Sequence, residues 1–297
     1  MNFKEIVRDV LLTEAKELEK TANKISFDIE KAIDLIVNSK GKLIVTGVGK
    51  SGLVGAKIAA TLASTGTSSF FLHPTEAMHG DLGMIGKDDI VLGISYSGES
   101  EELIQILPHL KRLNIPLIAM AKSENSTLAK YADVFINIAV DKEACPLDTA
   151  PTSSTTLTMA MGDALAVCLM KKRDFKKEDF ASFHPGGSLG KKLFVKVDDL
   201  LKKDNLPTVS RETKLKDAII VMSEGRLGNV IIVDENRTVF GVLSDGDLRR
   251  ALMNENFSIN CNVEDIATLN PKTLKNKDLL ASDALQIIEN YKIQLLI

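Results

Sequence analysis

Five short apolar runs constrain the fold of this chain more than any other feature of its sequence. They are KLIVT (42–46), SSFFL (68–72), DIVLGI (89–94), PLIAMA (116–121) and DVFINIAV (133–140). None alternates regularly between apolar and polar residues, which indicates strands that are buried on both faces. Between them, residues 54–62 and 103–110 carry apolar side chains at helical spacing. The sequence therefore predicts an α/β fold in which helices cover both faces of a parallel five-stranded sheet.

The loops that follow the predicted strands are the expected place for a ligand. In open parallel sheets, ligands bind beyond the carboxyl ends of the strands. Three such loops contain chemically active or phosphate-binding residue types: TGVGKSG (46–52), SYSGES (95–100) and VDKEACP (140–146). We expect the functional site to lie among these three loops.

The first loop matches parts of two nucleotide-binding motifs. TGVGKSG fits the dinucleotide fingerprint G-x-G-x-x-G and also the last three positions of a Walker A loop. Walker A is excluded because Ile44 stands where its first glycine is needed. The dinucleotide motif is disfavoured because His73 stands near the end of the second strand, where an acidic residue would hold the ribose. A tight strand-to-helix turn that requires glycine remains as the simpler interpretation.

The second loop has the composition of a phosphate cradle. Ser95, Ser97 and Ser100 supply hydroxyl groups, Gly98 supplies flexibility, and backbone N–H groups open the helix that follows. Any one of these serines could be only a helix cap. Three of them alternating around a glycine after a buried strand favour a site for a phosphorylated small molecule.

The last hundred residues contain an internal repeat. Residues 214–233 resemble residues 279–297, with Asp217-Ala218 matching Asp283-Ala284. Each copy predicts a helix that leads into a strand. The first copy continues into GVLSDGDLRRAL (241–252), whereas the sequence of the second stops at Ile297. We expect a small α+β module whose second repeat is incomplete.

Composition excludes several classes of function. The net charge of −3 gives no broad attraction to nucleic acid. Three cysteines without a C-x-x-C spacing do not indicate a disulfide framework or a zinc cage, and they favour a reducing, cytoplasmic compartment. The charged N-terminus lacks the apolar core of a signal peptide, and no apolar run reaches the length of a membrane span. We expect neither nucleic acid nor membrane as a partner.

Several motifs resemble a known family. TGVGKSG, SYSGES, HGDLGM (79–84) and APTSSTT (150–156) resemble the sugar isomerase (SIS) domain. KEACPLDTAPTSSTT (142–156) and FHPGGSLGKKL (183–193) are similar to the bacterial arabinose 5-phosphate isomerases in particular. The C-terminal repeats resemble cystathionine-β-synthase-type (CBS) regulatory motifs. The resemblance implies an SIS domain over residues 1–195 and a pair of CBS repeats over 196–297, the first at about 205–255 and the incomplete second at about 262–297.

The family resemblance implies an aldose-ketose isomerase. The reaction interconverts D-arabinose 5-phosphate and D-ribulose 5-phosphate through an enediol or enediolate, at the entry to the biosynthesis of the sugar acid Kdo for surface polysaccharides. It needs no cofactor. The resemblance also implies a homotetramer, and CMP-Kdo or another nucleotide as effector of the repeats. The competing hypothesis is a non-enzymatic sugar-phosphate sensor, which would not need acid–base residues.

Four positions match the catalytic set of the family: Lys50, Glu102, Glu143 and His184. Lys50 could offset enediolate or phosphate charge. Glu143, in a loop at the expected site, is favoured as the base that moves a proton between C1 and C2, and Glu102 comes second because a glutamate in a first helical turn commonly only stabilises the helix. His184 could open the sugar ring or shuttle a proton, because histidine is the side chain that exchanges protons near neutral pH.

The substrate-binding set implied by the resemblance and the loops is larger. It comprises Gly49, Ser51, Thr75, His79, Ser95, Ser97, Gly98 and Ser100. No metal is required, although His79 could take up adventitious zinc, for which one histidine is a poor site.

Overall fold

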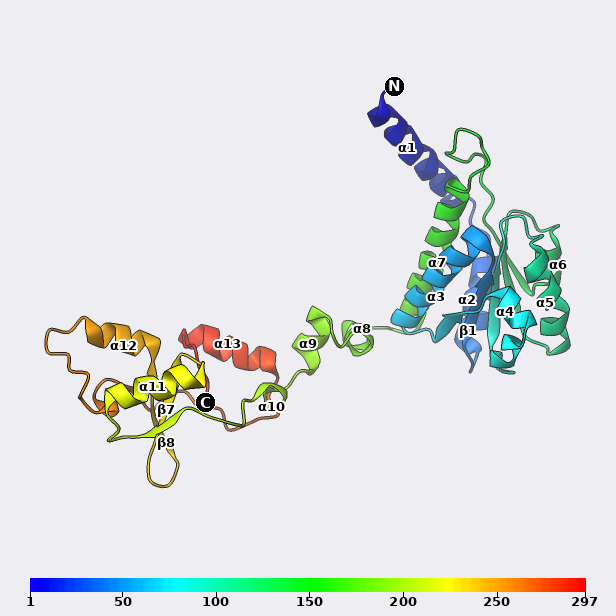
Figure 1. The fold of residues 1–297 in the computed structure, drawn as a ribbon. Helices are drawn as coiled ribbons and strands as arrows, with labels where there is room; N and C mark the ends of the chain where they lie inside the picture. The colour runs from blue at the N-terminus through cyan, green and yellow to red at the C-terminus, as the bar shows by residue number, and fades with distance from the viewer. The chain divides into compact units, whose positions relative to one another are not determined.

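The computed structural model describes residues 1–297, which divide into two compact units, Met1–His184 and Pro185–Ile297 (Figure 1). Each unit has hydrophobic clusters of its own.

The first unit is built on a five-stranded sheet in which every pairing is parallel. Its strand order is β2-β1-β3-β4-β5. The strands are β1 (Leu43–Gly47), β2 (Ser69–Phe71), β3 (Ile90–Ile94), β4 (Leu117–Ala121) and β5 (Val134–Asn137). All five predicted strands form, and the predicted α/β fold is confirmed. The three central strands are buried along their whole length, which explains why their sequences show no polar alternation.

Two layers of helices cover the sheet (Figure 1). On one face, side chains such as Val45 and Leu92 pack with α2 (Asp28–Asn38), α3 (Gly49–Ser64) and α7 (Ser153–Lys172). On the other face, Ile44 and Val91 pack with α4 (Pro74–Met78), α5 (Glu101–Arg112) and α6 (Thr127–Tyr131). Neighbouring residues of one strand thus enter opposite cores, as the period of two requires. A short 3₁₀ helix lies at Asp81–Met84.

Two long helices frame one side of this unit. α1 (Phe3–Ala22) packs against α7, and α7 packs against α3. By length and composition α7 is the one helix that could cross a membrane, which the sequence analysis did not foresee. Half of its apolar stretch is buried inside the unit, as in the core helix of a folded domain. After α7 the chain forms α8 (Lys177–Phe183) and ends the unit at His184.

The second unit contains a mixed sheet of order β6-β7-β8-β9. Its strands are β6 (Thr208–Ser210), β7 (Asn229–Val233), β8 (Val239–Ser244) and β9 (Thr268–Leu269). The helices are α9 (Ser188–Phe194), α10 (Val197–Leu200), α11 (Leu215–Gly225), α12 (Asp245–Leu252) and α13 (Ala281–Tyr291), with a 3₁₀ turn at Val263–Asp265. Val230, Ile232 and Leu243 are fully buried and form its core with α11.

The internal repeat is visible in the helices of this unit. α11 and α13 each span 11 residues, each buries the alanine of its Asp-Ala pair, and each ends at a left-handed residue, Arg226 or Lys292. The strands differ. β7 follows α11 as predicted, but the strand predicted after α13 does not form. Residues 292 and 293 donate back to α13, and beyond them only Ile297 makes backbone bonds, to residues 272 and 274, so no ladder of hydrogen bonds develops.

Candidate functional site

A cavity of about 300 Å³ lies where the N-termini of α3, α5 and α7 meet. All three helices begin at the carboxyl edge of the sheet, as predicted for the site. Its lining consists of Val48, Lys50, Ser51, Val54, Ser95, Tyr96, Ser97, Ser100, Pro151, Ser154, Thr155 and Thr158. Most of these side chains are serine, threonine or tyrosine, and the only charged one is a lysine. Because helix N-termini present unpaired N–H groups and positive partial charge, the cavity is suited to an anion with many oxygen atoms.

The glycines of the first loop bring strand β1 and helix α3 close together. A Cβ atom on Gly47 would lie 2.7 Å from the Ile94 carbonyl oxygen, and one on Gly52 would lie 2.7 Å from the Gly47 carbonyl oxygen. Gly49 has a φ of 58°, with open space where a side chain would be. The glycine pattern is therefore explained by a tight turn that starts α3 beside the cavity, as the simpler interpretation held.

The SYSGES loop is held by hydrogen bonds to its own serines. The Ser95 and Ser100 hydroxyls lie 2.9 Å apart, and the Gly98 N–H donates to the Ser95 hydroxyl at 3.1 Å. Ser97 is exposed at the cavity and accepts a bond from the Glu99 N–H. Gly98 has a φ of 71°, and a Cβ there would clash with the Ser126 hydroxyl. A larger residue at position 98 would thus push the loop away from its support.

Lys50 lies in the first turn of α3 and lines the cavity. It makes no salt bridge within the chain. A cation at a helix N-terminus faces the unfavourable end of the helix dipole. An anion bound between Lys50 and the helix N-termini would satisfy both.

The N-terminus of α7 supplies contacts that the sequence analysis missed as site residues. Ser154, Thr155 and Thr158 line the cavity from its first two turns. They belong to the hydroxyl-rich start of α7, which we used only for the family resemblance. The sequence pattern is the same as in SYSGES, a cluster of hydroxyl residues at the start of a helix. It differs in that no predicted strand directly precedes the helix. Tyr96 was also missed; burial raises the pKa of its phenol, which stays protonated.

Glu143 is buried directly behind this wall of the cavity. Its Oε2 accepts hydrogen bonds from the Thr152 N–H at 2.7 Å, the Thr152 hydroxyl at 2.9 Å and the Ser154 N–H at 3.2 Å. Burial by itself would raise the pKa of Glu143, but the bonds from Ser154 and Thr152 outweigh it and hold the pKa below its ordinary value. The carboxylate therefore stays ionised and also caps α7. All three of these bonds engage Oε2.

Three other residues of the predicted set, Glu102, Thr75 and His79, do not line this cavity. Glu102 is half-buried in the first turn of α5. Thr75 lies in α4, with its N–H donating to the His73 ring, and His79 is exposed at the end of that helix. No three His, Cys, Asp or Glu side chains gather in a way that could hold a metal ion.

His184 lies at the opposite end of the first unit. Glu143 caps the N-terminus of α7, and His184 comes after its C-terminus; a helix of 20 residues is about 30 Å long. The chain after α7 is anchored there, because Arg173 donates to the Gly66 carbonyl oxygen at the end of α3. The ring of His184 stacks on Phe180, with 4.0 Å between centroids. Nδ1 lies 2.8 Å from the Phe180 carbonyl oxygen, which can only accept, so Nδ1 carries the hydrogen and Nε2 is free.

Comparison with known proteins agrees with this architecture. The SIS domain model matches residues 35–168 and the CBS domain model matches residues 197–254. Among solved structures, a protein of E. coli CFT073 in complex with arabinose 5-phosphate is 40% identical, with a TM-score of 0.61, and covers 62% of this chain and 100% of its own.

Curated relatives extend the similarity over nearly the whole chain. A Helicobacter pylori protein is 53% identical over 98% of this chain and 90% of its own length. The arabinose 5-phosphate isomerase KdsD of Pseudomonas aeruginosa is 48% identical over 92% of this chain and 84% of its own length. A cavity formed by three helix N-termini in an SIS domain, together with these identities, places the chain in the arabinose 5-phosphate isomerase family.

Proposed function

We propose that this protein is an arabinose 5-phosphate isomerase that interconverts D-arabinose 5-phosphate and D-ribulose 5-phosphate, the first step of Kdo biosynthesis. The observation that carries the proposal is the hydroxyl-lined cavity with a single lysine, backed by a buried ionised carboxylate. KdsD relatives and the structure of 40% identity in complex with arabinose 5-phosphate support the same assignment.

In this proposal the phosphate lies on the SYSGES loop, where Ser97 and Ser100 face the cavity. Ser51 and the backbone at Gly49 and Gly98 complete the cradle. Thr75 and His79 do not line this cavity, so the substrate contact that the family resemblance implies for them is not part of this cradle. Lys50 offsets the negative charge of the enediolate. The sugar carbons then extend toward α7 and the carboxylate behind it.

Glu143 transfers the proton between C1 and C2 through Oε1. A carboxylate held ionised at neutral pH is ready to accept a proton, and its three bonds to the α7 N-terminus fix its orientation. Glu102 is the alternative base. Because the proton leaves one carbon and returns to its neighbour with no net oxidation, the reaction requires no redox cofactor.

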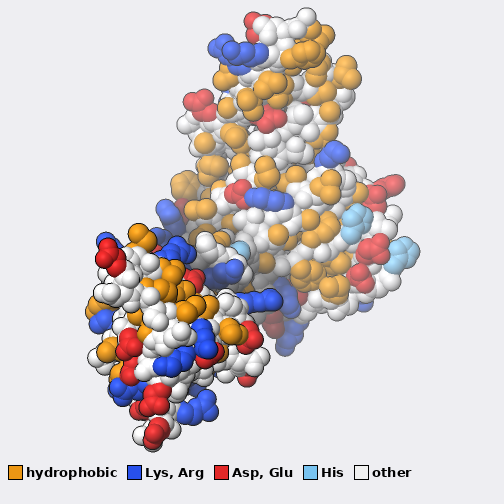
Figure 2. Space-filling view, turned by 60° about the vertical axis from the view of Figure 1, so that its left-hand side comes forward, with side chains coloured by type: hydrophobic (Ala, Val, Ile, Leu, Met, Phe, Trp, Pro, Cys, Tyr) orange, Lys and Arg blue, Asp and Glu red, His pale blue; other side chains and the backbone are white.

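His184 acts from a neighbouring subunit in a homotetramer. Its position at the far end of α7 supports this, since it does not reach the cavity of its own chain. An exposed apolar stripe on α1 supports association: Phe3, Val7 and Leu11, spaced four apart, are 71%, 57% and 61% exposed. Figure 2 shows hydrophobic side chains gathered over this projecting end of the molecule.

We assign the protein to the cytoplasm, which its three free cysteines support. Residues 1–195, which are the first unit together with the segment through α9, form the proposed catalytic domain, and the CBS repeats of residues 196–297 bind CMP-Kdo or another nucleotide as an effector.

The test is to incubate the chain with D-ribulose 5-phosphate in metal-free deuterated buffer and identify the aldose by NMR. We expect D-arabinose 5-phosphate, with solvent deuterium incorporated at C2, because an enediolate exchanges protons with the base. Binding of sugar phosphate without turnover would replace the enzyme by the sensor hypothesis. A different aldose would change the substrate assignment.

A further inference from the structure

The segment that leads from β5 to Glu143 has no secondary structure, yet its backbone is bonded. Residues 139–144 donate N–H groups to side chains: Ala139 to Asn137, Val140 to Tyr96, Asp141 to Glu17, Glu143 to Asp148 and Ala144 to Thr152. Side chains thus accept the hydrogen bonds that a neighbouring strand would accept in a sheet. Most of these acceptors come from the same strand, the same loop or the SYSGES loop. Glu17 comes from α1, more than a hundred residues away.

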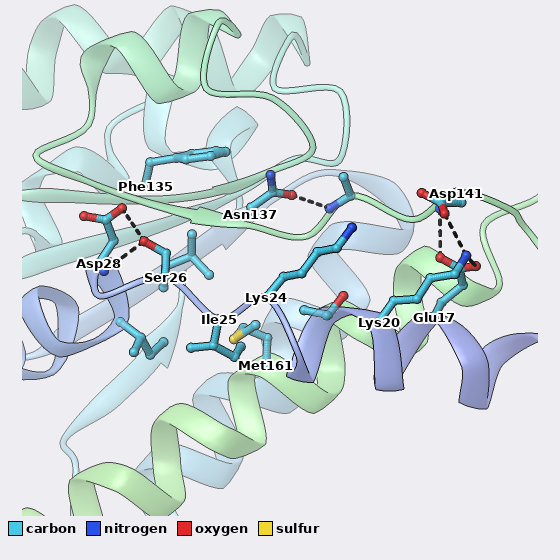
Figure 3. A pocket seen from close by; sticks show the side chains of 14 residues that line it. Glu17, Lys20, Lys24, Ile25, Ser26, Asp28, Phe135, Asn137, Asp141 and Met161 are labelled. Carbon is cyan, nitrogen blue, oxygen red and sulfur yellow. Dashed lines mark hydrogen bonds and ion pairs between the residues drawn. The ribbon is translucent and has the colours of Figure 1, made fainter.

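Glu17 is a buried carboxylate that the catalytic proposal leaves unused. It is 4% exposed, near the C-terminal end of α1. Its Oε2 accepts the Asp141 N–H at 2.8 Å, and its Oε1 pairs with the Lys20 ammonium at 2.7 Å. Lys20 in turn pairs with the Asp141 carboxylate at 2.7 Å. Figure 3 shows the three side chains joined in this way at one end of a second cavity, of about 220 Å³.

Glu17, Lys20 and Asp141 form a closed ring of hydrogen bonds and ion pairs. Asp141 is held through its backbone by Glu17 and through its side chain by Lys20, so α1 fixes both its position and its rotation. These bonds raise the pKa of Lys20 and lower that of Asp141, in each case chiefly through the hydrogen bond between the two side chains. Both groups therefore stay charged at neutral pH. Glu143 lies only two residues further along the chain.

A second contact ties α1 to the same site. The Thr156 hydroxyl on α7 donates to the Glu14 carboxylate at 2.9 Å, one turn of α1 before Glu17. α1 thus contacts both parts that orient Glu143, the segment that carries it and the helix that it caps. Burying the Glu17 carboxylate would destabilise the fold if its oxygens lacked partners. Both oxygens have one, the Asp141 N–H and the Lys20 ammonium.

We propose that Glu17 and Lys20 form a positioning clamp that aligns Glu143 for proton transfer. The inference rests on the proposed function, because it assumes that Glu143 takes part in the reaction. It assigns a role in turnover to α1, which lies outside the residues matched by the SIS domain model. Neither Glu17 nor Lys20 makes a hydrogen bond or an ion pair with the cavity residues on α3 and α5, so substrate binding should depend on the clamp less than turnover does.

The primary test is Glu17→Gln in the full chain, with Glu19→Gln as a matched control on the exposed side of the same helix. Glutamine has one acceptor oxygen where glutamate uses two, so its amide must face either Lys20 or the Asp141 N–H, both of which are donors. We expect kcat to fall by roughly ten- to a hundredfold while KM changes less than about twofold, since misplacing a catalytic group by a fraction of an ångström has effects of this size. Wild-type kcat per folded molecule in Glu17→Gln would overturn the proposal.

A double mutant separates positioning through Glu143 from a general structural role. If the clamp acts through Glu143, adding Glu17→Gln to Glu143→Gln should lower kcat no further. An additional loss of about tenfold in the double mutant would overturn it. Failure of the proposed function is distinct: the wild-type chain would then lack isomerase activity, or Glu143→Gln alone would keep it.

Amide hydrogen exchange provides the structural readout. We expect the amides of residues 139–144 to exchange faster in Glu17→Gln than in Glu19→Gln, with α3 and α5 unchanged. Should Glu17→Gln fail to fold, Lys20→Met keeps the bond from the Asp141 N–H to Glu17 and removes only the ion pairs. A folded Lys20→Met protein should show a several-fold loss of kcat at unchanged KM, and wild-type kcat and exchange would then overturn the clamp.

Discussion

The two units follow the same local rules but differ in how their strands find partners. In the first unit every predicted strand forms, because each has a parallel neighbour and helices on at least one face. In the second unit two matching helices, α11 and α13, form alike, yet only α11 is followed by a strand. The difference teaches that a helix is specified by its own residues, whereas a strand also needs a neighbour to bond to.

The same contrast applies to function. The cavity with catalytic residue types lies wholly within the first unit, where α3, α5 and α7 begin side by side at one edge of the sheet. The CBS match lies wholly within the second. We propose that turnover belongs to the first unit and regulation to the second.

Glu143→Gln should have the largest effect, a loss of kcat of about 100- to 10,000-fold, as for removal of a general base. Glutamine can keep its oxygen at the α7 N-terminus, so the fold should survive. Turnover and the melting temperature of the first unit check this. Full activity would remove Glu143 from the mechanism and leave Glu102 as the base.

Ser97→Ala should raise KM for the sugar phosphate by about tenfold with little change in kcat, because a hydrogen bond to phosphate is similar in ground and transition states. Steady-state kinetics on the purified variant measure both constants. An unchanged KM would move the phosphate to the Lys50 loop.

A matched pair of core variants should separate the stabilities of the two units. Leu165 in α7 and Leu243 in β8 are both fully buried, and replacing either by alanine should destabilise its own unit by about 2 to 5 kcal/mol. Leu243→Ala should leave kcat unchanged at room temperature. Calorimetry together with activity tests this, and an equal loss of activity in both variants would show that the units do not divide the work.

The smallest effect concerns acid stability. The fold lowers the pKa of Glu143, so the ionised carboxylate adds to the free energy of unfolding at pH values above its unfolded pKa. This contribution is lost as the pH falls from the ordinary value of 4.5 through the lower folded pKa. Wild type should exceed Glu143→Gln in stability by about 1 kcal/mol near neutrality, and the gap should close on acidification. Melting curves from about pH 7 to about pH 3 measure it. A gap that is constant with pH would mean that the carboxylate charge does not stabilise α7.

Particular residues show which parts of the fold and of the site can be predicted from the sequence. The buried strands and the SYSGES loop were predictable because their signals are local runs of residues. The capping of α7 by Glu143 was not, since it joins a loop residue to a helix start nine to eleven positions later. The clamp from Glu17 to Asp141 spans 124 positions and has no local signal. The family resemblance named His184, but the place of its ring relative to a site depends on chain packing that no sequence period encodes.

The division of labour is tested most directly by comparing kcat for D-arabinose 5-phosphate between the full chain and residues 1–195 alone. The account predicts equal kcat and KM within about twofold, because the cavity, Lys50 and Glu143 all lie in the first unit. A fragment that is folded and oligomeric but inactive would contradict it, and would place part of the catalytic machinery in the CBS unit.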